Sequence, residues 1–137
     1  MARTIQPPGW PRPRGYSNGM AARGEILAIA GQIGWDENER LVGHDFLPQF
    51  AQALRNVRTV VRAAGGDCEH VVSMTIFVTD RSDYLGNLAD VGRVYREIMG
   101  RHFPAMALVE VSALLEPGAV VEIQALAVLP APEETSP

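Results

Sequence analysis

The chain of 137 residues is 47% hydrophobic, which predicts one globular domain spanning residues 1–137 and argues against disorder. Its twelve basic residues are all arginine and its net charge is −4, which excludes a Schiff-base lysine and does not favour a broad nucleic-acid surface. A single cysteine, Cys68, excludes an intrachain disulfide and a cysteine-based zinc site.

The first half of the chain predicts an arm, a strand and a long helix. Residues 1–14 are rich in proline and are expected to form an extended arm. Residues 25–31, EILAIAG, form a compact apolar run that predicts a buried strand. From Asp45 to Ala64 apolar residues recur at spacings of three and four, which predicts a helix that stops at Gly65. The expected apolar stripe comprises Leu47, Phe50, Leu54, Val57, Val61 and Ala64.

The second half predicts a strand, a helix and two further strands. Residues 71–80 are β-branched and aromatic, as in a strand. Ser82 is expected to cap the second helix. Two strands are predicted at 103–111 and 120–128, followed by a flexible tail over residues 129–137. The second helix is expected to place Leu85, Leu88, Val91, Tyr95 and Ile98 on one side.

This order of elements predicts an α+β fold in which two helices cover one face of a mixed sheet. The opposite face of the sheet is then uncovered. Along the last strand Val120 and Leu126 alternate with Glu122 and Gln124, so that this face is half apolar. Such a face indicates an interface between copies of the chain, with a site in it.

Several function classes are not supported by the sequence. The N-terminal segment lacks the apolar core of a signal peptide, and no run reaches the roughly 18 apolar residues of a membrane helix. We therefore expect a cytoplasmic protein without membrane contacts. We also expect no metal and no cofactor, because His44, His70 and His102 lack metal-ligand spacing and GQIG is not a phosphate-binding loop.

Six local runs of the chain carry a further signal: GYSNG (15–19), AGQIGWD (30–36), VRAAGG (61–66), VVSMTIFVTD (71–80), FPAMALVEV (103–111) and VEIQALAV (121–128). Together these runs resemble the reactive-intermediate deaminase family, called Rid or YjgF. The resemblance implies a fold like that of the small chorismate mutases, assembled into a homotrimeric barrel with three clefts between subunits. It also implies hydrolysis of enamines and imines made by other enzymes.

The resemblance also assigns residues to the cleft. Glu122 matches the glutamate that positions or activates water, while Tyr16 and Gly31 match a tyrosine and a turn that shape the cleft. Other positions depart from the family pattern. Ala30 stands where the family has a serine, and Gly92 stands where it has an asparagine. Met106 occupies the position of the carboxylate-binding arginine, and Leu108 occupies that of a small polar residue or cysteine.

The arginine position has the largest consequence. A thioether at Met106 cannot pair with a carboxylate, so the resemblance places the chain in a branch that does not favour small 2-imino acids. Arg12 and Arg14 either replace that contact from another direction or belong to a solvated arm. Glu110, in contrast, is expected to be structural and to bind backbone amides or an arginine.

Three functions follow from these patterns. The first is an enamine or imine deaminase acting on a small-molecule metabolite in a homotrimer, with Glu122 handling protons. The second is a non-catalytic trimer that binds or senses a metabolite, because several cleft positions are altered. The third, endoribonuclease or translation inhibitor, is disfavoured by the acidic charge and the absence of lysine.

Overall fold

The computed structural model describes residues 2–131. The strands are β1 (Arg3–Ile5), β2 (Gly19–Ala21), β3 (Glu25–Ile33), β4 (Val71–Val78), β5 (Ala105–Glu110) and β6 (Val121–Leu129). The helices are α1 (Phe46–Ala63), α2 (Arg81–Leu85) and α3 (Leu88–Met99), and Cys68–His70 form a 3-10 turn. No helix in this part of the chain combines the length and apolar character that a bilayer crossing requires.

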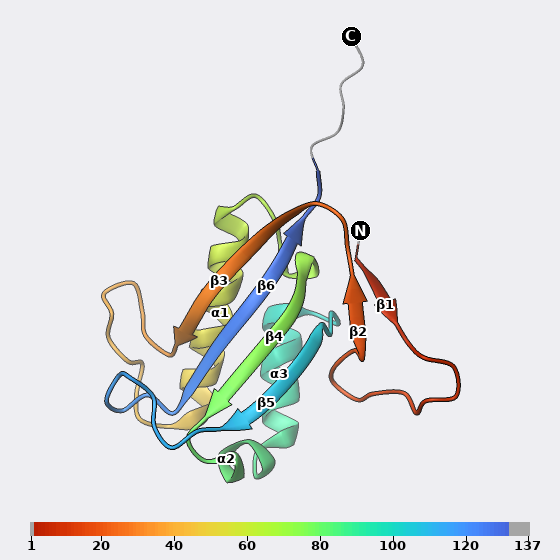
Figure 1. Ribbon diagram of the computed structural model, residues 1–137. Helices are drawn as coiled ribbons and strands as arrows, with labels where there is room; N and C mark the ends of the chain where they lie inside the picture. The colour runs from red at the N-terminus through yellow and green to blue at the C-terminus, as the bar shows by residue number, and fades with distance from the viewer. Residues whose placement is uncertain (1, 132–137) are drawn as a thin grey trace.

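Four strands form the main sheet in the order β3-β6-β4-β5 (Figure 1). Strand β6 pairs antiparallel with both β3 and β4, whereas β4 and β5 are parallel. Parallel neighbours need a crossover, and α2 and α3 provide it. The structure confirms the predicted α+β fold with a mixed sheet.

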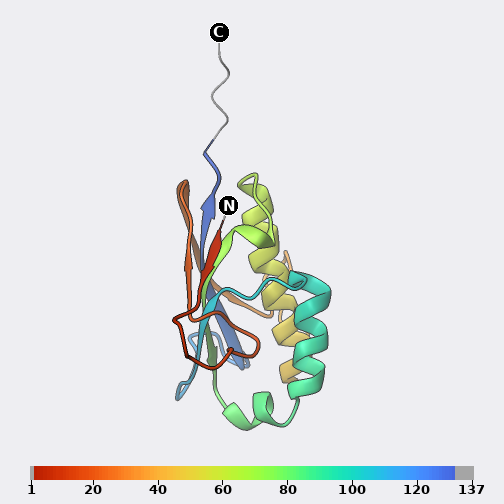
Figure 2. The ribbon, with the colours of Figure 1, turned by 90° about the vertical axis from the view of Figure 1, so that its right-hand side faces the viewer.

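Helices α1 and α3 cover one face of this sheet, and the other face carries no helix of residues 2–131 (Figure 2). Along β6 every second residue from Val121 to Leu129 is buried, because these side chains meet the helices. Helix α1 is confirmed within one residue at each end, and Gly65 ends it with a φ of 89°. The buried residues of its stripe include Phe50, Leu54, Val57 and Val61.

The single second helix expected from Ser82 is wrong, because the chain forms two helices there. The Asp80 side chain accepts the Ser82 N–H at 2.9 Å, so Asp80 is the cap. Asn87 Nδ2 then donates to Asp83 O, and α3 starts at Leu88. As a result Leu85 and Leu88 are exposed rather than on the buried stripe. The buried residues of α3 are Val91, Val94, Tyr95, Ile98 and Met99.

Both predicted ends need correction. Residues 1–14 are not only an arm, since β1 pairs antiparallel with β2. The predicted tail starts too early, because Leu129 is buried as the last residue of β6; residues 132–137 of that tail lie outside the described part. After the arm, Ser17 forms a parallel bridge with Ala105, so this segment lies along the edge of β5.

Tyr95 joins α3 to the loop before β5. Its ring stacks on Phe103 with centroids 5.3 Å apart, and its hydroxyl donates to His102 O at 2.5 Å. Burial raises the pKa of Tyr95 above its ordinary value, with a smaller effect from Cys68. The folded state therefore holds this phenol in its protonated form.

We expect Tyr95→Phe to change how stability depends on pH. The stabilisation by the protonated phenol is complete below about pH 10 and is lost as pH rises above that value. At about pH 8 the variant loses one hydrogen bond, a cost of about 1 kcal/mol. Between about pH 8 and pH 11 it should lose less stability than wild type in urea unfolding. Equal losses in the two proteins would contradict this account, and Tyr16→Phe, at an exposed tyrosine, is the control.

Candidate functional site

A bulge in β3 shapes the edge of the uncovered sheet face. Ile29 pairs with Ala125 and Gln32 pairs with Ile123, so Ala30 and Gly31 together oppose one residue of β6. The Gln32 side chain donates to Ala30 O at 3.0 Å and holds the bulge. Bulges of this kind bend a strand locally and are common next to active sites.

Glu122 lies directly over this bulge. It projects from β6 on the uncovered face, half-buried, and a Cβ built at Gly31 would lie only 2.8 Å from its Cδ. A side chain at position 31 would therefore displace the carboxylate. The ion pairs among the described residues are Arg62–Asp67, Arg93–Asp90 and Arg93–Glu97, so Glu122 takes part in none of them.

A buried amide from α1 fixes the start of β6. Gln49 is fully buried, and its Nε2 donates to Gly43 O at 2.8 Å and Gly118 O at 2.9 Å. Its Oε1 accepts the Val120 N–H at 2.9 Å, two residues before Glu122. The three backbone groups that bind this side chain all belong to loops at one end of the sheet. Gln49 thus positions the strand that carries the candidate catalytic carboxylate.

The second group of predicted residues lies at the other edge of the sheet, on β5. Met106 pairs with Met74 and Leu108 pairs with Ile76 in the parallel ladder, and Met106 and Leu108 pack against the core on the helix side. They line an open pocket of about 220 Å³. The residues lining it are Arg14, Gly15, Tyr16, Ile76, Tyr84, Met106, Ala107 and Leu108.

Tyr16 reaches this pocket because its neighbour is tied to the chain before β5. Ser17 N donates to Pro104 O at 3.1 Å, and Ser17 Oγ donates to Phe103 O at 2.5 Å. Ser17 is buried, whereas Tyr16 is exposed toward the pocket. Residues 14–16, at the end of the arm, thus supply one wall of the pocket and β5 the other.

The structure therefore divides the predicted site residues into two clusters. Ala30, Gly31 and Glu122 lie on the uncovered face where β3 pairs with β6, and Tyr16, Met106 and Leu108 lie at the β5 edge. Gly92 belongs to neither cluster. It is half-buried in α3, where an added Cβ would lie 3.1 Å from Arg96 Nη1.

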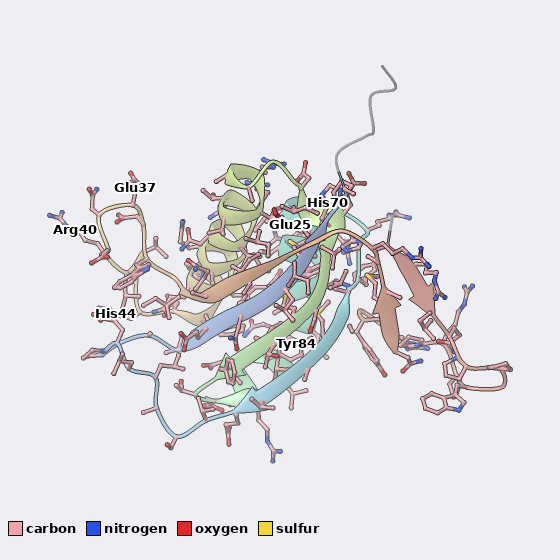
Figure 3. All side chains as sticks on the ribbon, turned by 45° about the horizontal axis from the view of Figure 1, so that its top comes forward. Glu25, Glu37, Arg40, His44, His70 and Tyr84 are labelled. Carbon is pink, nitrogen blue, oxygen red and sulfur yellow. The ribbon has the colours of Figure 1, made fainter. Side chains whose placement is uncertain are left out.

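Sequence reasoning missed Tyr84, which lies in α2 and faces β4 and β5 (Figure 3). The signal was hidden because the expected helix placed Leu85 on its buried side. Because the cap is Asp80 and not Ser82, the helix presents Tyr84 to the core instead of Leu85. Glu110 is structural, as expected, since its carboxylate accepts the Arg81 N–H at 2.9 Å at the start of α2.

Other reactive side chains lie away from both clusters. Cys68 is buried, and burial, followed by the charge of Asp67, raises the pKa of its thiol, so it is a poor nucleophile. His44 and His70 lie at different ends of the molecule (Figure 3). Within residues 2–131, histidine, cysteine and acidic side chains do not gather in groups of three that could hold a metal ion.

Comparisons with known proteins agree on one family. The family model described as endoribonuclease L-PSP matches residues 11–129. A RutC family protein of Pyrococcus horikoshii is 36% identical over 119 residues, which cover 85% of this chain and 90% of the relative. A 2-iminobutanoate/2-iminopropanoate deaminase of Salmonella typhimurium is 36% identical over 108 residues, covering 77% and 80%.

A solved structure supports the same assignment. The crystal structure of YyfB from Yersinia pestis, a protein of unknown function in the Rid family, has a TM-score of 0.83 at 34% identity. The alignment covers 93% of this chain and 98% of that one. The chain, with its α+β fold and mixed sheet, belongs to the Rid (YjgF) family, whose family model is described as endoribonuclease L-PSP.

Proposed function

We propose that this protein is a deaminase that hydrolyses enamine or imine metabolites in clefts formed between copies of the chain. The observation that carries the proposal is the Glu122 carboxylate, which lies over the Gly31 bulge on the uncovered face and is free of ion pairs with residues 2–131. The deaminase name of the Salmonella relative supports the same chemistry.

Glu122 suits the proton transfers that imine hydrolysis requires. Water adds to the carbon of a protonated imine and gives a proton to Glu122. As the C–O bond forms, the electron pair of the C=N double bond moves to nitrogen. Glu122 then returns the proton to nitrogen, and the C–N bond breaks as the hydroxyl oxygen forms a carbonyl. The departing ammonia takes the hydroxyl proton, so the products are a carbonyl compound and ammonium. An enamine joins this route after protonation at carbon.

The β5 edge selects the substrate. Met106 stands where the family resemblance places a carboxylate-binding arginine, and a charge-assisted hydrogen bond is worth about 1.5–3 kcal/mol. Leu108 and Ile76 make the surrounding wall apolar. The preferred enamines or imines are therefore larger or more apolar than small 2-imino acids.

Two copies of the chain are needed to complete this cleft. Glu122 projects from the uncovered face, whereas Met106 and Leu108 project toward the helix side of the same sheet. One small molecule cannot reach both clusters within one copy. A second copy that packs its β5 edge against the uncovered face brings them together, and a homotrimer closes the arrangement. Exposed apolar side chains on the uncovered face, Ile26, Val109 and Leu126, fit such an interface.

We expect Glu122→Gln to lower ammonia release by about 100-fold or more, because it removes the general base and acid. Imines are generated in the assay from leucine, methionine or phenylalanine by an amino-acid oxidase. Glu116→Gln is the matched control, since Glu116 is exposed in a turn. Equal rates for Glu122→Gln and wild type would refute the role of Glu122. A stable complex without any turnover would instead support a non-catalytic binder.

We expect Leu126→Asp to dissociate the oligomer without unfolding the chain. Leu126 is 43% exposed in one copy, so a charge there is tolerated in a monomer but not in a dry interface. In sedimentation, wild type should show three times the 14.9 kDa mass of one chain and the variant a single mass. Leu115→Asp, at a fully exposed turn position, is the control. A monomeric wild type would contradict the proposed cleft.

A further inference from the structure

The pocket at the β5 edge contains a cation, Arg14, that enters from the N-terminal arm and not from position 106. Arg14 is the one charged side chain among the described residues that line it. The side chain is exposed, and it belongs to none of the ion pairs within residues 2–131. A guanidinium without a protein counter-ion beside an open pocket is available to an anionic ligand.

The backbone around Arg14 is held in place. Gly15 has a φ of 76°, a conformation that favours glycine, and it turns the chain between Arg14 and Tyr16. The bridge from Ser17 to Ala105 follows two residues later. Arg14 is thus three residues from a point fixed on β5, which keeps its backbone close to the pocket that it lines.

The rest of the lining is apolar or aromatic. Met106, Leu108 and Ile76 come from adjacent strands. The ring of Tyr16 comes from the segment just after the arm, and that of Tyr84 from α2. A ligand with one carboxylate can pair with the exposed guanidinium, whereas the second charge of a dianion would lie against hydrocarbon. The lining therefore fits a molecule with one carboxylate and a large apolar body.

We propose that Arg14 binds the substrate carboxylate from the arm and that the pocket takes monocarboxylates with bulky apolar side chains. The inference rests on the proposed function for the view that this pocket forms part of the reactive cleft. The binding preference itself concerns only the β5-edge pocket. It gives the arm a role in specificity, because the cation approaches the ligand from the arm rather than from position 106.

Binding of two probes to the assembled, full-length protein tests the inference by calorimetry. Phenylpyruvate is a carbonyl analogue of a bulky 2-imino acid, and its methyl ester has the same body without the charge. Wild type should bind the acid about tenfold more tightly than the ester, and Arg14→Gln should remove that preference while leaving ester binding unchanged. Arg12→Gln is the control, because Arg12 lines a neighbouring pocket, and it should change affinity by less than about twofold.

Three results would overturn the inference: no binding of phenylpyruvate to wild type, equal effects of Arg14→Gln and Arg12→Gln, or equal loss of acid and ester binding. Arg14→Gln/Met106→Arg should recover acid binding if the pocket is correctly identified. If the preference for the acid depends on Arg14 but no imine releases ammonia, the deaminase proposal is refuted and the binding inference stands. Turnover that depends on Glu122 but not on Arg14 would refute this inference alone.

Discussion

The alternation of side chains along a strand is the constraint on which this structure depends. In the central strands β6 and β4, one set of residues meets α1 and α3, and the next set faces away from them. Glu122 belongs to the outward set of β6, and Met106 pairs in the ladder with an inward residue of β4. The same alternation that builds the core therefore separates the candidate catalytic carboxylate from the candidate substrate pocket.

Local features then prepare each half of the site. The bulge at Ala30 and Gly31 gives the Glu122 carboxylate room that a regular strand with a side chain would deny. Gln49 ties the start of β6 to two loops, so the carboxylate is carried by a strand with a fixed beginning. At the other edge Ser17 holds the arm against the start of β5. Both halves are thus rigidly supported, although they face in different directions.

Much of the fold follows from local patterns in the sequence. The stripe from Phe50 to Val61 predicts α1, and the alternation around Glu122 predicts β6 with one uncovered side, because both periods are set by neighbouring residues. The start of α2 was misplaced because Asp80 and Ser82 are both good caps and only geometry decides between them. The break between α2 and α3 was missed because it lies at Gly86 and Asn87, inside a run whose apolar residues keep helical spacing. The separation of Glu122 from Met106 was also beyond sequence reasoning. It depends on the register between strands that are distant in the chain, and a shift of one residue would reverse it.

The central claim, that each cleft combines Glu122 of one copy with the β5 edge of another, is tested most directly by subunit complementation. Glu122→Gln removes the carboxylate half of the cleft, and Met106→Trp blocks the half at the β5 edge. Each variant alone should lack deaminase activity. When equal amounts are unfolded and reassembled together, about a quarter of the clefts should contain two intact halves, and activity should return in proportion. If both halves belonged to one copy, no cleft would be intact, and the absence of any recovery in mixed oligomers would contradict the account.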